Sequence, residues 1–423
     1  EESFVIHADL LIPGRGDPME DVSVVVKDNK IADITTKSSL SDAFKDLPSI
    51  SVPVLMPGLW DCHIHLMGAK DFQFAGMLMA HPATMGARLA RSLHDIIMSG
   101  FTSVRDLGGY ACEVAIPVNE GIIPGPNIYS AGSAISQTAG HGDVFDVPVG
   151  WAWQRAGVSV HANGDNVGMA PLMLADGVDE VRKAVRLNIR RGAKVIKVLA
   201  SGGVLSRDDN PLDQQFSDEE LKIIVEEAAR AKRIVAAHVH GKEGIMAALR
   251  AGCKTLEHGT FLDEETIKLA KEKDIVYVAT RTVVVEGVKH PELMSPESYE
   301  KMKLTAKYHE AAVKLAIKHG VKMATGCDLS ISEPGKSLSH GNSGGEPGYL
   351  VDAGMTPLQA IEAATANGPL TLGPQAPMSG QVKKGYDADL IALDKNPLED
   401  ISVLAKVKHI THVWKGGKVF KSP

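Results

Sequence analysis

The sequence predicts an α/β protein, a (β/α)8 TIM barrel with a small β-sandwich formed by the N- and C-terminal segments. Through the middle of the chain, eight short apolar runs alternate with helical patterns, as in barrels whose parallel strands are each followed by a helix. Both ends instead contain short extended runs that are interrupted by glycine and charged residues. This pattern is typical of a small sheet. We expect the sandwich in residues 1–56 and 377–423, and the barrel in residues 57–376.

The apolar runs of the middle segment are candidate parallel strands. Most of them are continuous rather than alternating, as expected of strands that are covered on both faces. They end near Trp60, Arg105, Ser130, Val198, His238, His258, Thr280 and Thr325. Because active sites of such barrels lie at the carboxyl ends of the strands, functional side chains should cluster at these positions.

Helices between the strands have recognisable starts and stops. Residues 217–220 (Ser-Asp-Glu-Glu) form a capping box, Thr356 precedes a first-turn proline, and Gly192 follows a helical pattern. Two stretches, 132–175 and 329–350, show little periodicity. Both follow predicted strands, so we expect them to form lids over the active site.

The terminal segments contain runs too short to form separate domains. The extended runs cover residues 4–8, 23–26 and 31–35 near the start, and 389–393, 412–414 and 418–420 near the end. Neither piece is long enough for a core of its own. We therefore expect both pieces to pack together.

Composition excludes several classes of protein. The net charge of -7 and a pI near 6.2 argue against a general nucleic-acid partner. No run approaches the roughly 20 consecutive apolar residues of a membrane span, and the first residues lack the pattern of a signal peptide. This leaves both the cytoplasm and secretion open. Cys62, Cys112, Cys253 and Cys327 are widely spaced and predict free thiols.

Six side chains that can bind metals follow the predicted strands. They are His63, His65, Lys197, His238, His258 and Asp328. Neutral imidazoles and a carboxylate suit zinc or a similar divalent metal. His63 and His65 share one face of an extended segment, because alternate residues of a strand point the same way. Taken singly, each histidine could equally be a core residue with its hydrogen bonds satisfied, and Asp328 could be a loop cap.

Lys197 is the unusual member, because an ammonium group has no lone pair to donate. It lies inside a run that predicts a buried strand, where lysine is rare without a partner. One explanation is a lysine whose amine reaches out of the strand end to solvent. The other is a carbamate, formed from the amine and carbon dioxide, which would act as a carboxylate ligand. The full set then predicts a two-metal hydrolytic centre.

The chain resembles the amidohydrolase superfamily, in its binuclear subtype with a carbamylated lysine. The resemblance is carried by the six positions above and by residues 56–59, 102–109, 136–143, 197–204, 237–241 and 355–361. These segments are most similar to the branch that contains Xaa-Pro and Xaa-Arg dipeptidases and ochratoxinases. Residues 192–211 are most like the ochratoxinases. The resemblance runs nearly end to end and is weakest over residues 283–350.

The resemblance implies the role of each ligand. His63, His65 and Asp328 would hold one zinc ion, and His238 and His258 the other. Carbamylated Lys197 and a hydroxide would bridge the two metals, and Asp328 would move the proton from the attacking hydroxide to the leaving amine.

Three further residues are candidates for substrate contacts. His141 could donate to the scissile carbonyl oxygen as a catalytic residue, and Arg281 could grip a substrate carboxylate. His240 could line the same face as His238. Each also has an ordinary structural explanation: a loop histidine, an ion pair and a core histidine, respectively.

The expected reaction is hydrolysis of an amide bond that releases a C-terminal amino acid. The resemblance implies ochratoxin A, cleaved to ochratoxin alpha and phenylalanine, or an N-acyl amino acid or dipeptide. A cyclic amidase or lactonase with the same metal centre is the alternative, whereas Lys197 argues against a one-metal deaminase. A metal-free binding protein would lack some of the ligands. The resemblance also implies a homo-oligomer, such as an octamer.

Overall fold

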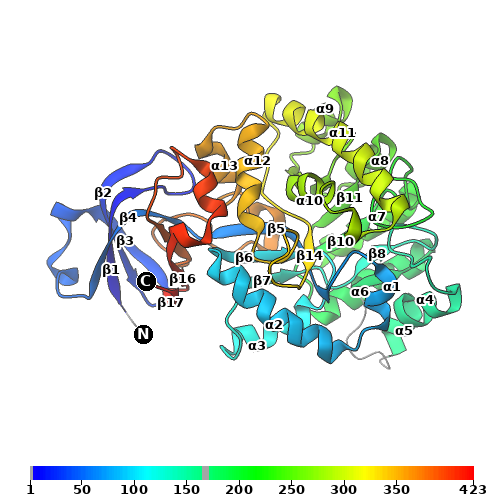
Figure 1. The fold of residues 1–423 in the computed structure, drawn as a ribbon, viewed down its shortest axis with the longest axis horizontal. Helices are drawn as coiled ribbons and strands as arrows, with labels where there is room; N and C mark the ends of the chain where they lie inside the picture. Colours follow the sequence, from blue (N-terminus) through cyan, green and yellow to red (C-terminus); the bar gives the residue numbers. More distant parts are fainter. Residues whose placement is uncertain (1–2, 164–170) are drawn as a thin grey trace.

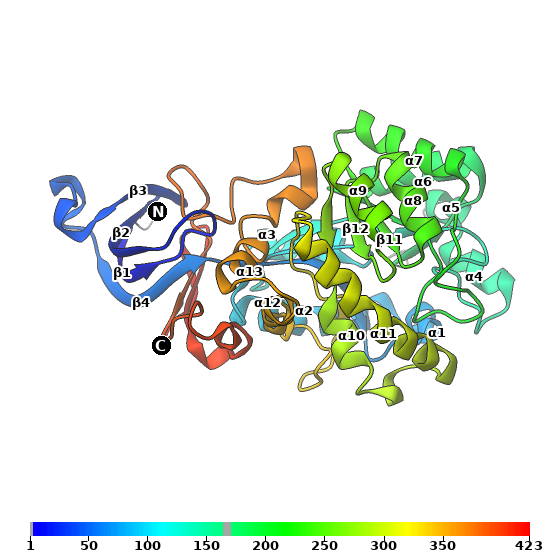
Figure 2. The same cartoon turned by 90° about the horizontal axis from the view of Figure 1, so that it is seen from above.

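The computed structural model describes residues 3–163 and 171–423. A seven-stranded sheet at one end of the elongated molecule combines strands from both ends of the chain, and the remaining elements form a larger α/β body (Figures 1 and 2). In sheet order the strands are β17 (Lys418–Lys421), β16 (Ile410–Lys415), β15 (Leu390–Leu393), β4 (Ser49–Pro57), β1 (Phe4–Leu11), β2 (Met19–Lys27) and β3 (Lys30–Thr36).

Pairing of β15 with β4 joins the C-terminal strands to the N-terminal ones. Leu390 lies opposite Pro57 and Leu393 opposite Val54 in this antiparallel pair. Most pairs in the sheet are antiparallel, and β1 with β4 is parallel. Both terminal segments expected from the sequence thus contribute to one sheet and share one apolar cluster that includes Trp414.

Two parallel sheets make up the larger body. One has the order β13 (Val276–Val278), β12 (Thr255–His258), β11 (Val235–Val239), β10 (Ile196–Leu199), β8 (Ala134–Ser136) and β9 (Leu172–Leu174). The other has the order β14 (Leu329–Ile331), β5 (Leu59–Ala69), β6 (Phe101–Asp106) and β7 (Asn127–Ser130). These sheets confirm the α/β fold class with parallel strands that the sequence predicts.

Backbone hydrogen bonds connect the two parallel sheets through segments that lie outside the strands. The amide of Lys194, just before β10, donates to Ser130 of β7 at 2.7 Å. Residues 322–325 accept from both sheets, from Tyr277 of β13 at Lys322 and from Cys62 of β5 at Thr325, each at 2.8 Å. The run that ends at Thr325, expected to be a strand, forms only an isolated bridge between Met323 and Tyr277.

Helices cover the outer faces of the parallel sheets (Figures 1 and 2). They include α1 (Phe74–Met79), α2 (Pro82–Met98), α3 (Ala111–Asn119), α4 (Val149–Ala156), α5 (Val158–Asn163), α6 (Gly177–Arg191), α7 (Asp218–Arg230), α8 (Lys242–Ala251), α9 (Glu264–Glu272), α10 (Arg281–Gly287), α11 (Pro296–Lys318), α12 (Glu346–Asp352) and α13 (Pro357–Ala363). The capping box of α7 and the cap of α13 by Thr356 are confirmed, as is the stop of α6 at Gly192, whose φ is 116°.

The stretches with little periodicity contain short elements. Strands β8 and β9 lie within residues 132–175, and β14 and the first turn of α12 lie within residues 329–350. A strand of three residues is too short to show a period of two, which is why the sequence did not reveal it. Residues 164–170 of the first stretch lie outside the described residues, and a lid role for either stretch stays a prediction.

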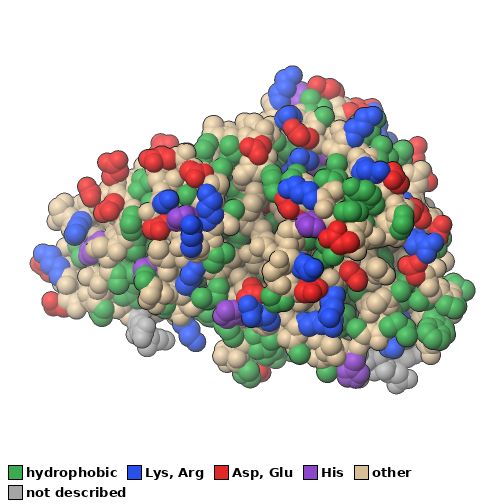
Figure 3. Space-filling view, in the orientation of Figure 1, with side chains coloured by type: hydrophobic (Ala, Val, Ile, Leu, Met, Phe, Trp, Pro, Cys, Tyr) green, Lys and Arg blue, Asp and Glu red, His purple; other side chains and the backbone are tan. Residues whose placement is uncertain are grey.

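The surface carries charge of both signs. On the face shown in Figure 3, acidic and basic side chains are interspersed rather than gathered into one patch. No helix in the described ranges is both long and apolar enough to cross a membrane. The four cysteines are free, as predicted, and Cys112 is the one that is not fully buried.

Candidate metal centre

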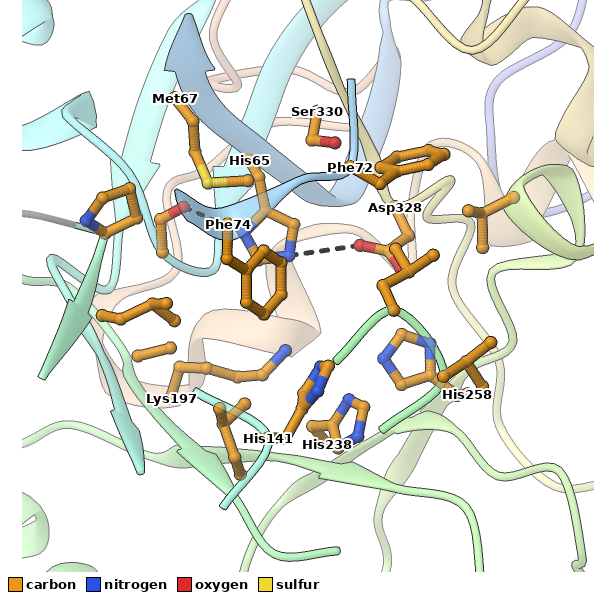
Figure 4. A pocket seen from close by; sticks show the side chains of 18 of the residues that line it. His65, Met67, Phe72, Phe74, His141, Lys197, His238, His258, Asp328 and Ser330 are labelled. Carbon is orange, nitrogen blue, oxygen red and sulfur yellow. Dashed lines mark hydrogen bonds and ion pairs between the residues drawn. The ribbon is translucent and has the colours of Figure 1, made fainter. Parts of the chain in front are cut away.

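Five of the six predicted ligands line one pocket of the α/β body, and the sixth lies directly behind it. His63 and His65 lie on β5, Lys197 on β10, His238 on β11 and His258 at the end of β12, while Asp328 directly precedes β14. All but His63 line the pocket, together with apolar side chains such as Met67, Phe72, Phe74 and Met302 (Figure 4). His63 lies just behind this surface, fully buried.

The first group of ligands consists of His63, His65 and Asp328, whose ligand atoms all lie within 4.8 Å of one another. The Asp328 carboxylate lies 3.1 Å from Nε2 of His65 and 3.4 Å from Nε2 of His63, and Figure 4 shows His65 pointing at it. The Nδ1 atom of His65 contacts the Gly108 carbonyl at 2.9 Å. A carbonyl can only accept, so this Nδ1 is protonated and Nε2 is left as the ligand atom.

A buried carboxylate supports His63 from behind. Glu257 accepts from Nδ1 of His63 at 2.8 Å and from the Arg105 guanidinium at 2.6 Å, and all three side chains are fully buried. Burial raises the pKa of the Glu257 carboxyl, but the charge of Arg105 and the His63 contact outweigh it and lower that pKa to about 2. Glu257 is therefore a fixed anion next to His63, one of the predicted ligands.

The second group consists of His238, His240 and His258, again within 4.8 Å of one another. Thr280 donates its hydroxyl proton to the Ala279 carbonyl and so accepts from Nδ1 of His258 at 2.8 Å, which leaves Nε2 of His258 free. His238 has the opposite arrangement: Nε2 donates to the Gly202 carbonyl at 3.1 Å and Nδ1 is free. Burial, followed by the neighbouring histidines, lowers the pKa of His238 well below its usual value, which keeps the ring in the neutral form that binds metals.

Three residues at this centre have a left-handed backbone conformation that orients their side chains. His258, Thr280 and Asp328 have φ values of 73°, 56° and 60°, a region that residues other than glycine seldom adopt. On an ideal strand, Glu257 and His258 would point to opposite faces. The left-handed turn at His258 lets both side chains serve the same centre. Strain of this kind is concentrated at functional sites.

Lys197 is buried at the centre of this arrangement. It is 1% exposed, and its Nζ atom lies 3.4 Å from Nε2 of His63. Burial lowers the pKa of the amine to about 8, against the opposing effect of the Glu257 and Asp328 charges. The side chain does not reach solvent, so the alternative of a lysine that extends out of the strand does not apply. The donor atoms around it fit two divalent cations.

Of the three expected substrate contacts, His141 and His240 line the pocket. His141 stacks on His238 with ring centroids 4.3 Å apart, and His240 is held by a 2.7 Å contact between its Nδ1 atom and the Thr260 hydroxyl. Arg281 is not brought to the pocket. Its guanidinium instead lies 3.2 Å from His309 and 3.7 Å from Glu310 on α11.

Several supporting residues were given no role by sequence reasoning. Glu257 and Thr280 contact the predicted ligands His63 and His258, and Arg105 contacts Glu257. One signal could have revealed the first two: a glutamate and an arginine inside apolar strands require each other when buried.

Comparison with known proteins identifies the family. A family model described as the amidohydrolase family matches residues 54–420. Ochratoxinase of Aspergillus niger is 53% identical over 425 residues, which cover 99% of this chain and 87% of that protein. The crystal structure of A. niger ochratoxinase has a TM-score of 0.91 and 51% identity, covering 100% of this chain and 96% of that chain.

More distant solved structures share the same architecture. A Xaa-Pro dipeptidase with methionine bound in its active site has a TM-score of 0.83 and 29% identity, with 100% of both chains covered. The resemblance stated from sequence motifs is therefore confirmed. A family model that spans most of the chain, and a relative at this level of identity, establish that the chain is a hydrolase of the amidohydrolase family.

Proposed function

We propose that this protein is a binuclear zinc amidohydrolase that cleaves ochratoxin A, or an N-acyl amino acid or dipeptide of similar form, and releases the C-terminal amino acid. The observation that carries the proposal is the convergence of ligand-type side chains on one pocket, in a chain 53% identical to an ochratoxinase. We also propose that the parallel strands close into a (β/α)8 barrel, which the backbone hydrogen bonds of Lys194 and of residues 322–325 to the sheets support.

The residues divide into two sets of ligands. His63, His65 and Asp328 would hold one cation through two Nε2 atoms and a carboxylate oxygen. His238 would offer Nδ1 and His258 would offer Nε2 to the other, because their second ring nitrogens are engaged. Lys197, as a carbamate, would reach both. Two bound cations would lower the pKa of a shared water and polarise the scissile carbonyl.

Asp328 is the proposed proton carrier. Its carboxylate lines the pocket and faces His65, so it can accept a proton from the attacking water and pass it to the departing nitrogen. That second transfer matters, because an amine leaves a tetrahedral carbon far more readily than an amide anion does.

The apolar part of the pocket favours an apolar or aromatic amino acid at the cleaved bond. Phe72, Phe74 and Met302 contribute to a wall that is buried or largely buried. Such a wall excludes water and binds an aromatic ring through its apolar area. Phenylalanine, the amino acid of ochratoxin A, matches these requirements.

Hydrolysis of ochratoxin A tests the proposal directly. The zinc-loaded protein should release phenylalanine and ochratoxin alpha, identified by mass spectrometry, and should contain two zinc ions per chain. A panel of N-acyl amino acids, dipeptides, cyclic amides and lactones belongs in the same experiment, with Asp328→Asn protein as the control. If only cyclic amides or lactones are opened, the alternative replaces this proposal.

A further inference from the structure

The loop between β10 and α7 packs against the His141 ring. A Cβ atom added at Gly203 would lie 1.9 Å from Nδ1 of His141 and 2.1 Å from its Cε1 atom. No side chain fits between ring and loop, so the Gly203 backbone lies directly against the ring. The loop therefore fixes the position of the His141 ring. The loop residues that contact this ring belong to neither of the two proposed sets of metal ligands.

The hydrogen bonds of Ser206 assign the proton on His141. The Ser206 hydroxyl oxygen lies 2.7 Å from Nδ1 of His141 and 2.6 Å from Oδ1 of Asp209. A hydroxyl has one proton to donate, and a carboxylate can only accept. The Ser206 proton therefore points to Asp209. The hydroxyl oxygen accepts from His141, so Nδ1 of the ring carries a proton.

Asp209 is held as an acceptor by groups around it. Its side chain is 2% exposed, and the Lys301 ammonium on α11 donates to Oδ1 at 2.9 Å. The Gly203 amide donates to Oδ2 at 2.7 Å. Lys301 also donates to the Ser206 carbonyl at 3.0 Å, which ties the loop to α11. A buried carboxylate with these donors stays ionised and keeps its geometry.

We propose that Ser206, Asp209 and Lys301 are positioning residues that hold His141 with its Nδ1 proton directed at Ser206, so that Nε2 is the ring atom presented to the pocket. The contact expected from the sequence, between His141 and the scissile carbonyl oxygen, would then be made through Nε2. The inference rests on the proposed function for its catalytic meaning, whereas the proton on Nδ1 is a property of the protein itself.

Nitrogen NMR of histidine side chains tests the proton on Nδ1 of His141 without any substrate. In the zinc-loaded protein, the His141 ring is identified as the signal that disappears in His141→Gln. We expect a protonated Nδ1 in the wild type, and a partial loss of the Nδ1 proton in Ser206→Ala. A wild-type His141 without a proton on Nδ1, or Nδ1 protonation unchanged in Ser206→Ala, overturns the proposal.

Steady-state kinetics test whether the proton on Nδ1 of His141 matters for turnover. Asp209→Asn and Ser206→Ala should each lower kcat roughly ten- to a hundredfold, the usual effect of losing a hydrogen bond to a charged group, while KM changes little. Asp208→Asn is the matched control. Asp208 is the exposed neighbour with a φ of 57°, a conformation that asparagine tolerates, and its kcat should equal that of the wild type.

The two tests separate this inference from the proposed function. Full kcat in both variants overturns the positioning role even if ochratoxin A is a good substrate. If no amide is cleaved but the NMR result is as expected, the proposed function fails and the assignment of a proton to Nδ1 of His141 stands. If Asp209→Asn does not fold, Ser206→Ala decides, because it removes one hydroxyl and leaves the Lys301–Asp209 pair in place.

Discussion

The two halves of the candidate metal centre are supported by groups of different charge. On one half, His63 donates to the Glu257 carboxylate, which is paired with Arg105. On the other half, His258 donates to the Thr280 hydroxyl and His238 to a backbone carbonyl, and both acceptors are neutral. A carboxylate partner makes an imidazole a stronger electron donor than a neutral partner does. We therefore expect the His63 half to hold its cation more tightly.

Replacing Lys197 tests whether cation binding at one half of the centre depends on the other half. This substitution should give the largest effect on turnover. As the ligand that both halves would share, its removal in Lys197→Ala should abolish turnover and reduce the zinc content from two ions per chain to about one. Short carboxylic acids should restore part of the activity by replacing the missing carboxylate. Two retained zinc ions with normal turnover would rule out a shared ligand.

Asp328 tests the His63 half alone. Asp328→Asn keeps the size of the side chain and one ligand oxygen, but it removes the proton acceptor. Turnover should fall by about 10²–10⁴-fold, the usual contribution of a general acid–base, while circular dichroism shows an unchanged fold. A loss of less than tenfold would place proton transfer on another residue.

Glu257 and Thr280 allow a direct comparison of the two supports. Glu257→Gln should weaken zinc binding at the His63 half by roughly 10–100-fold, as measured by competition with a chelator. It should also lower the free energy of unfolding by about 3–5 kcal/mol, because Arg105 is left buried and unpaired.

The matching change on the other half is Thr280→Val, which removes a hydroxyl at nearly constant shape. A neutral hydrogen bond contributes about 0.5–1.5 kcal/mol, so zinc affinity should fall only about two- to tenfold. Equal losses in the Glu257 and Thr280 variants would show that the charge of the support has no influence on the cation.

Arg281 should give the smallest effect on catalysis. Its guanidinium contacts His309 and Glu310 and does not line the pocket. The ratio of kcat/KM for a substrate with a free carboxylate to that for the same substrate capped as an amide should therefore be equal in wild type and Arg281→Ala. A ratio that falls toward one in the variant would restore Arg281 as the carboxylate-binding residue.

Sequence reasoning succeeded where a metal-binding residue type lies on a predicted parallel strand. His65, Lys197 and His258 lie on β5, β10 and β12 and line one pocket, because the shared direction of the strands brings such side chains together. Their roles as ligands stay predictions from the family resemblance. The capping box of α7 was also predictable, because its chemistry lies within four consecutive residues.

The direction of a side chain at a strand end could not be predicted in the same way. Arg281 directly follows Thr280, whose left-handed backbone sends the next residues into α10 and turns the guanidinium toward α11. His258 points to the same centre as Glu257 only because its own backbone leaves the extended conformation. Both outcomes depend on single φ values that residue type does not determine, since none of these positions is a glycine.

The pairing of β15 with β4 also bears on the order in which this protein folds during synthesis. The edge of β4 that receives β15 stays unpaired until residues 390–393 have left the ribosome, and an exposed strand edge invites pairing with other chains. Strand β4 is therefore made long before the strand that completes its pairing. Ribosome-bound chains that stop before Leu390 should lose their N-terminal strands to a protease, whereas chains released at full length should retain them.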